Sequence, residues 1–128
     1  MKKIIIDLDG TLTIDSPGRY EDKLPNLAVI ERLKDYKEKG FLICVNTARN
    51  MRTYNGNLGQ INIHTLPVIL SWLKVNGVPY DEVIVGKPWC GTEGFYVDDR
   101  AIRPGEFARL SLEEIKVLLS EDARVGES

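Results

Sequence analysis

Two carboxylates near the start of the chain are the side chains best placed to do chemistry. Asp7 and Asp9 are separated by one residue and are followed by Gly10 and Thr11. They are close enough in sequence to act on one substrate. The glycine lets the backbone turn sharply and approach a ligand closely. The segment 7–11 is therefore a candidate active-site loop.

Other reactive side chains stand at the ends of later apolar runs. Thr47 follows the run FLICVN, Lys87 follows EVIVG, and Asp98 and Asp99 follow GFYV. If these runs are parallel strands, their carboxyl ends lie along one edge of a sheet, where open α/β sheets bind their ligands. We therefore expect all of these residues and Asp7 to converge on one cleft.

The strands that must position these residues alternate with helical patterns. Ile4, Ile5 and Ile6 form a short apolar run, which predicts a parallel strand covered on both faces. A helix is predicted to begin at Pro25 and to end at Gly40, and FLICVN is the next strand. Strand, helix and strand form a right-handed βαβ unit. The face of this helix is predicted to carry Leu27, Ile30, Leu33 and Tyr36.

The second half of the chain continues the alternation. A helix is expected from Pro67 to Gly77 with its apolar stripe in the core, followed by strands at 82–86 and 94–97. Ser111 and Glu114 form a capping box for a terminal helix that packs against the sheet. The polar segments 14–24 and 48–65 are predicted to be loops. The stripe comprises Val68, Ile69, Trp72 and Leu73, and the terminal helix carries Ile115, Leu118 and Leu119.

Length and pattern predict an α/β protein in which residues 1–128 form a single Rossmann-like domain. Its sheet is mainly parallel and flanked by helices, and 128 residues leave no room for a separate cap domain. The 17 basic and 19 acidic residues give a net charge of −2, so no extended nucleic-acid surface is expected.

The cysteines and the N-terminus indicate a cytoplasmic protein. Cys44 lies in an apolar run and Cys90 in a loop, without the spacing of a metal site or a disulfide framework. The N-terminal apolar run passes directly into aspartates, so it is not a signal peptide. No stretch approaches transmembrane length, and no membrane partner is expected.

The order D-x-D-G-T-L-T, followed by Thr47, Lys87 and the pair Asp98 and Asp99, resembles the four motifs of the haloacid dehalogenase superfamily. Most members are phosphatases that use an aspartate nucleophile and Mg²⁺. The short form without a lid also resembles members encoded beside capsular polysaccharide and nucleotide-sugar genes. The resemblance implies a phosphatase of a small metabolite, with a sugar phosphate as one candidate.

The carboxylates expected at this edge of the sheet favour a bound metal ion. Carboxylates gathered at one place repel one another unless a cation joins them. Oxygen ligands without nearby histidine or thiolate favour Mg²⁺. We expect Asp7, Asp98 and Asp99 to supply its oxygens, with Asp99 the better candidate for direct contact because adjacent side chains point apart. The resemblance adds the backbone carbonyl of Asp9.

The mechanism that the resemblance implies forms an aspartyl-phosphate. Asp7 attacks phosphorus, and Asp9 protonates the leaving oxygen and then activates water. Thr47 and the amide of Ala48 bind phosphoryl oxygens, and Lys87 offsets their charge.

The two polar segments are expected to cover a site that has no lid. Arg49 and Arg52 suit an anionic part of the substrate, and Tyr54 suits a sugar face. A neighbouring subunit in a homo-oligomer would complete the enclosure. If specificity does not lie there, the loop 89–93 beside Lys87 is the next candidate.

Two other classes of protein remain possible from the residues. A phospho-accepting receiver domain is also a small doubly wound sheet, but it needs an acceptor Asp after the third strand, and EVIVGK has none. A catalytically silent domain that binds a sugar phosphate is the second alternative. Lys87 lacks the surroundings of a P-loop, and His64 is expected to be a surface or capping residue.

Overall fold

The computed structural model describes residues 2–127, with side chains described for residues 2–121. The chain divides into two compact units, Met1–Trp89 and Cys90–Ser128. The first unit carries the sheet, and the two units are described separately below.

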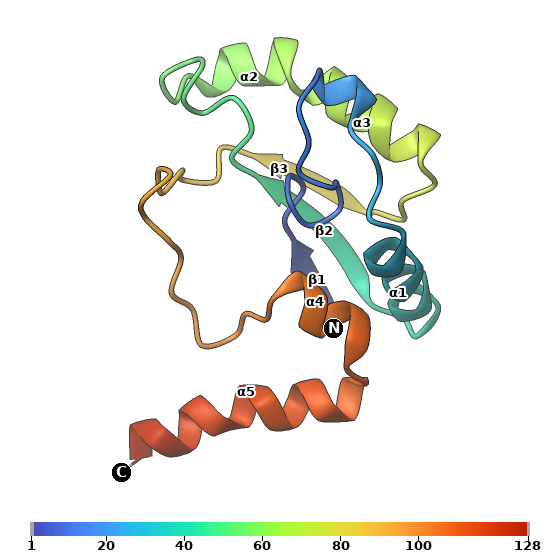
Figure 1. Ribbon diagram of the computed structural model, residues 1–128, viewed down its shortest axis with the longest axis vertical. Coiled ribbons are helices and arrows are strands. Elements are labelled where there is room, and N and C mark those ends of the chain that lie inside the picture. The colour runs from blue at the N-terminus through green and yellow to red at the C-terminus, as the bar shows by residue number, and fades with distance from the viewer. Residues whose placement is uncertain (1, 128) are drawn as a thin grey trace. The chain divides into compact units, whose positions relative to one another are not determined.

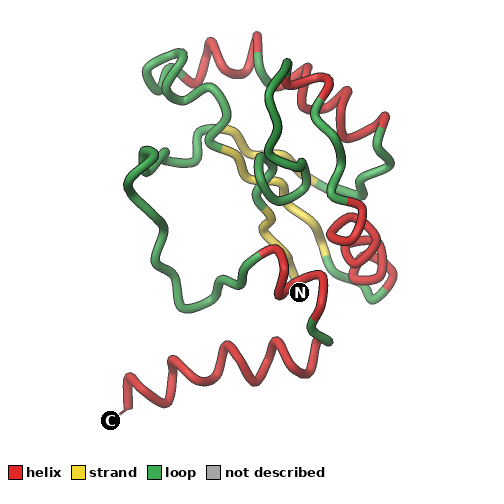
Figure 2. The backbone as a smooth tube through the Cα atoms, in the orientation of Figure 1, coloured by secondary structure: helices red, strands yellow, loops and turns green. Residues whose placement is uncertain are grey.

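The first unit is a three-stranded parallel sheet with helices between its strands (Figure 1). The strands lie in the order β1-β2-β3, and both neighbouring pairs are parallel. Figure 2 shows that helices and loops alternate with these strands along the chain. The predicted strand–helix–strand arrangement and the α/β class are confirmed. The elements are β1 (Lys3–Ile6), η1 (Tyr20–Asp22), α1 (Leu27–Glu38), β2 (Leu42–Thr47), α2 (Leu58–His64), α3 (Leu66–Val75) and β3 (Glu82–Val85).

Helix α1 differs from the prediction at its first turn. It begins after Asn26, whose side chain accepts a hydrogen bond from the Val29 amide, so Asn26 and not Pro25 marks the start. Pro25 instead forms an isolated antiparallel bridge with Thr13. Leu27, predicted to face the core, is 64% exposed because the buried face begins two residues later, at Val29. That face consists of Val29, Ile30, Leu33 and Tyr36.

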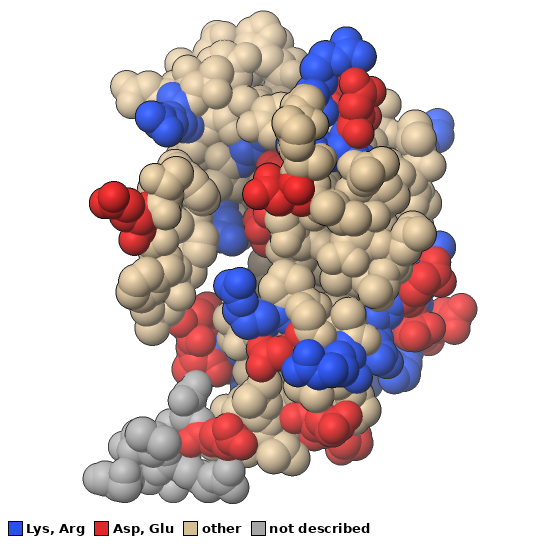
Figure 3. Space-filling model, in the orientation of Figure 1, with Lys and Arg blue, Asp and Glu red and all other residues tan. Residues whose placement is uncertain are grey.

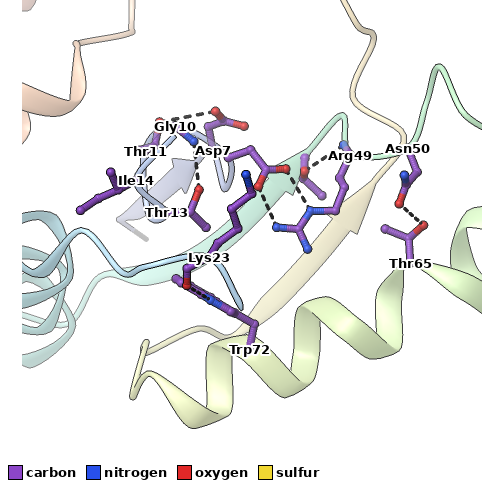
Figure 4. Close-up of polar contacts among 12 residues, drawn as sticks. Asp7, Gly10, Thr11, Thr13, Ile14, Lys23, Arg49, Asn50, Thr65 and Trp72 are labelled. Carbon is purple, nitrogen blue, oxygen red and sulfur yellow. Dashed lines mark hydrogen bonds and ion pairs between the residues drawn. The ribbon is translucent and has the colours of Figure 1, made fainter. Parts of the chain in front are cut away.

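Helix α3 agrees with its predicted stripe. Pro67 lies in the first turn, where its missing N–H costs no helical hydrogen bond. Ile69, Trp72 and Leu73 are buried. The Trp72 indole N–H donates to the Lys23 carbonyl at 2.8 Å, which ties the segment 14–24 to this helix (Figure 4).

The sheet of the first unit is covered on one face, and not on both as predicted for the first strand. Ile6, Ile43 and Val45 are buried on the covered face, but Ile5 is 65% exposed and Ile84 on β3 is 51% exposed. Cys44, in register with Ile5, is nevertheless buried. An ion pair of 2.7 Å joins Lys3 to Glu82 across the same face. The triple isoleucine therefore alternates between core and surface, as any strand does.

The segment 48–65 is not a continuous loop, because α2 occupies its second half. Asn57 caps this helix by accepting a hydrogen bond from the Gln60 amide at 3.2 Å. Ile61 is its one buried side chain. The polar composition concealed the helix, since one apolar anchor over two turns gives almost no periodic signal.

The second unit contains α4 (Pro104–Arg109) and α5 (Leu112–Glu127). The capping box is confirmed at α5: the Ser111 amide donates to Glu114, and the Glu114 amide donates to Ser111 Oγ at 3.1 Å. These bonds lower the pKa of Glu114.

The predicted fourth strand, GFYV at 94–97, is not formed. Phe95 and Val97 are 78% and 88% exposed, and among residues 2–127 the segment joins no β-ladder. A side chain at Gly94 would meet the carbonyl oxygen of Cys90, so the chain bends tightly there. An apolar run becomes a strand only where a neighbouring strand can accept its hydrogen bonds.

Charged side chains of both signs are mixed on the face shown in Figure 3. No helix within the described part of the chain is long and apolar enough to cross a membrane.

Candidate active site

Asp7 leaves the carboxyl end of β1 beside Lys87. The Lys87 ammonium lies 3.8 Å from Asp7 Oδ1, and Thr11 donates to Asp7 Oδ2 at 3.4 Å. Burial raises the pKa of Asp7 above its ordinary value, and the positive charge of Lys87 only partly opposes this. The carboxylate is therefore held in a place where its negative charge is incompletely compensated.

The loop after β1 closes on a single carbonyl. The amides of Thr11, Leu12 and Thr13 all donate to the Leu8 oxygen, at 2.9–3.2 Å. Gly10 has φ +80°, a conformation that other residues rarely adopt. Its amide donates to Thr13 Oγ1 at 3.2 Å (Figure 4). This tight loop carries Asp9 away from the strand and toward the end of β2.

Asp9 is held by Arg49, which follows β2. Arg49 Nε donates to Asp9 Oδ2 at 2.9 Å, and Arg49 Nη2 donates to Asp9 Oδ1 at 2.7 Å. The Arg49 side chain is fully buried, whereas Asp9 keeps 35% of its side chain exposed. The arginine was predicted to contact the substrate from a covering loop. Its side chain is buried and binds a proposed catalytic carboxylate, and its contact with a substrate stays a prediction.

Thr47 ends β2 as predicted and is buried. Its Oγ1 accepts a hydrogen bond from the Arg49 amide at 3.0 Å. The Lys87 amide donates to the Thr47 carbonyl at 3.1 Å, so the backbone itself fixes Lys87 beside the end of β2. Gly86, between β3 and Lys87, has φ +89°, and a side chain there would collide with Leu58 of α2.

The other predicted substrate contacts are less enclosed. Ala48 is half-buried, and Arg52 is exposed. The Tyr54 ring stacks on His64, with centroids 5.6 Å apart. His64, in the last turn of α2, also pairs with Gln60 at 3.1 Å, in agreement with its predicted capping or surface role.

Asp98 and Asp99 belong to the second unit and are exposed. They do not end a strand, because GFYV forms none, and Asp98 Oδ1 accepts a hydrogen bond from the Arg100 amide at 2.7 Å. Across the part of the chain that the structure describes, no three acidic, histidine or cysteine side chains form a group able to hold a metal. The contribution of this pair to a metal site stays a prediction.

The surroundings of Asp7 nevertheless suit a hard cation. Its half-buried carboxylate has a raised pKa because Lys87 does not offset the whole cost of partial burial. Carboxylate and carbonyl oxygens are the ligands that Mg²⁺ prefers. Asp7 and the loop that follows it therefore fit a magnesium ion by their donor chemistry.

Two contacts in the site were not predicted. Thr11, named only as part of the loop 7–11, donates to Asp7, and the centroid of the Tyr20 ring lies 4.2 Å from the Arg49 guanidinium carbon. Thr11 could have been found from its place four residues after Asp7 in a glycine turn. Tyr20 gave no signal, since its contact joins η1 to a residue 29 positions later.

The comparisons with known proteins agree with this arrangement. A family model described as haloacid dehalogenase-like hydrolase matches residues 4–80, which include Asp7, Asp9 and Thr47. This chain therefore belongs to the haloacid dehalogenase-like hydrolases, and a hydrolase reaction of the phosphatase type is supported in general. Hydrolases of this family generally use Mg²⁺.

Among solved structures, the chain is similar to a structural-genomics target from Vibrio cholerae. The two are 60% identical, with a TM-score of 0.94, over 95% of this chain and 99% of the other. Two structures of a Pnkp1/Rnl/Hen1 complex, one titled an RNA repair complex, are 22% identical to this chain. Their TM-scores are 0.47 and 0.49, over 66% and 85% of this chain and 25% and 34% of theirs. These two matches are too distant to bear on function. No curated protein matches the chain.

Proposed function

We propose that this chain is a Mg²⁺-dependent phosphomonoesterase that acts through an aspartyl-phosphate on Asp7. The observation that carries the proposal is the Asp7 carboxylate 3.8 Å from the Lys87 ammonium, at the sheet edge where β2 ends in Thr47. A nucleophilic carboxylate, a cation and a hydroxyl at one edge are the groups that phosphoryl transfer needs.

In the proposed reaction, Asp7 attacks phosphorus as the bond to the leaving oxygen breaks. Asp9 gives a proton to that oxygen, then takes one from the water that hydrolyses the aspartyl-phosphate. The Thr47 hydroxyl donates to a phosphoryl oxygen, and Lys87 offsets charge on Asp7 and the transferring group. Mg²⁺, held by Asp7 and the Asp9 carbonyl with Asp98 and Asp99 as further candidates, would supply charge neutralisation.

We propose a small phosphorylated metabolite as substrate, with a sugar phosphate of polysaccharide biosynthesis as the first candidate. Arg49, next to Asp9, supports a leaving group rich in oxygen atoms. We further propose a cytoplasmic homo-oligomer without nucleic-acid or membrane partners. The free thiols of Cys44 and Cys90 agree with a reducing compartment. Exposed Ile14 and Leu24, in the segment 14–24, support contact with a second copy.

The direct test is a screen of the purified protein against a panel of phosphate esters with Mg²⁺, reading released phosphate. We expect turnover of at least one small ester, and loss of that turnover in excess EDTA. Activity that persists in the chelator would contradict the metal requirement. No turnover of any ester would contradict the phosphatase itself.

A further inference from the structure

Arg49 is held by three contacts within the first unit, two of them to its guanidinium and one to its backbone amide. Two of its nitrogens bind the two oxygens of Asp9, at 2.9 and 2.7 Å. The Tyr20 ring lies over its face at 4.2 Å, a distance typical of a cation–π contact. Its own backbone amide is bonded to Thr47 Oγ1. The arginine therefore has little freedom to turn, and neither has the carboxylate that it binds in two places.

The third nitrogen of the guanidinium has no partner among the residues that the structure describes. Nη1 of Arg49 is buried and makes no hydrogen bond to any part of the chain that the structure describes. Native proteins rarely leave a buried charged N–H without an acceptor, because desolvation is then uncompensated. A donor of this kind, beside a partly exposed carboxylate, points to an oxygen supplied by a ligand.

We propose that Arg49 is a positioning residue with two tasks: it orients Asp9 toward the leaving oxygen, and it donates from Nη1 to a second oxygen of the leaving group. The proposal rests on the proposed phosphatase function and deepens it. The substrate is then a phosphate ester of a polyol or sugar, in which a hydroxyl lies close to the ester oxygen. An ester whose leaving group lacks such an oxygen leaves Nη1 unpaired.

The leaving group also determines how strongly turnover depends on Asp9. An alkoxide needs a proton as it departs, whereas nitrophenolate is stable enough to depart without one. Hydrolysis of the aspartyl-phosphate also uses Asp9 but is common to both esters, so the comparison uses kcat/KM, which reports formation of the aspartyl-phosphate. A change that disturbs only the position of Asp9 therefore lowers kcat/KM for an alkyl ester more than for an aryl ester. A change that merely loosens the fold slows both alike.

The test compares Arg49→Lys with the wild type on glycerol 2-phosphate and on p-nitrophenyl phosphate, each with Mg²⁺. Lysine keeps the charge but cannot bind both oxygens of Asp9 while also donating to the ligand. We expect kcat/KM on glycerol 2-phosphate to fall roughly 10- to 100-fold. The same ratio for p-nitrophenyl phosphate should change about 2-fold or less.

Arg109→Lys, at an exposed arginine of α4, is the matched control and should leave kcat/KM for both substrates unchanged. If Arg49→Lys does not fold, as judged by its thermal melt, Tyr20→Leu tests the same contact from the other side. Tyr20→Leu should lower kcat/KM by a smaller factor than Arg49→Lys, and again more for the alkyl ester than for the aryl ester.

Equal losses of kcat/KM on the two esters would overturn the inference while leaving the phosphatase in place. A wild-type protein that releases phosphate from neither ester, nor from any other in the panel, would overturn the function and the inference together.

Discussion

Asp7 and Asp9 have different surroundings, and their substitution should have different consequences. Asp7 faces Lys87, and Asp9 is bound by Arg49. Asp7→Asn removes the proposed nucleophile and should abolish turnover. Asp9→Asn should reduce kcat by about 10²–10⁴-fold, the usual range for lost acid–base assistance. Steady-state kinetics on the best ester of the screen measures both.

The same two variants offer an internal control. Asparagine is close in size to aspartate, so both proteins should fold, and their thermal melts should verify this. Similar residual rates for the two variants would contradict the separate roles.

The pair formed by Asp9 and Arg49 lay beyond what the sequence could reveal. Both residues were predicted to belong to the site, but the arginine was assigned to a covering loop and the aspartate to the loop after the first strand. Their contact joins residues 40 positions apart and depends on how far the Gly10 turn carries the chain. Sequence patterns report local periodicity and do not specify such distances.

Asp81 links three elements at the start of β3. Its Oδ2 accepts from the Ile43 amide of β2 at 2.8 Å, and both its oxygens lie 2.7 Å from Lys37 Nζ of α1. The hydrogen bond from Lys37 lowers the pKa of Asp81 most, and the hydrogen bond from the Ile43 amide lowers it further. The carboxylate thus helps to set the register in which β3 delivers Gly86 and Lys87.

We expect this contribution to depend on pH in a defined direction. The pKa of Asp81 is lower in the folded protein than in the unfolded chain, where it is about 3.9. Its stabilisation of the fold is therefore present above the unfolded-state pKa and is lost as the pH falls through the folded-state pKa. Asp81→Asn should therefore lower Tm by about 2–5 °C at pH 7. The difference from wild type should shrink below pH 4. Thermal melts across this range are the measurement.

Asp35→Asn, at an exposed carboxylate on α1, provides the comparison. It should change Tm little at either pH. A Tm difference for Asp81→Asn that is the same at pH 3 and pH 7 would show that the charge is not responsible.

The elements differ in how well the sequence predicted them, and the reason is physical. Strands β1, β2 and β3 and helix α3 were predicted because apolar runs and a helical stripe record burial directly. GFYV gave an equally strong pattern, yet a strand also needs a neighbour, which composition does not reveal. Helix α2 was missed for the opposite reason: a capping asparagine and Ile61 are enough to fix it.

Association into a homo-oligomer remains a prediction for the protein in solution. Leu24 is 61% exposed in the segment 14–24, which Trp72 ties to the first unit through the Lys23 carbonyl. Burying such a side chain against a second copy would remove apolar surface from water. We expect sedimentation velocity to give a mass of at least two chains. Leu24→Lys should shift the population toward the monomer.

Val75→Lys is the matched control, because Val75 is also exposed but lies at the far end of α3. It should leave the mass unchanged. Sedimentation of the wild-type protein as one chain at all concentrations would contradict the predicted homo-oligomer.

The ion pair between Lys3 and Glu82 also has a consequence for colloidal behaviour. In the sheet of the first unit, β1 and β3 are the outer strands, and each carries one of these charges on the same face as Ile5 and Ile84. Outer strands with apolar side chains invite strands from other molecules, which is how amyloid-like growth begins. Charges placed there act as gatekeepers, since a foreign strand would have to desolvate them. Two residues remote from the proposed active site thus oppose aggregation of a sheet that is covered on one face only.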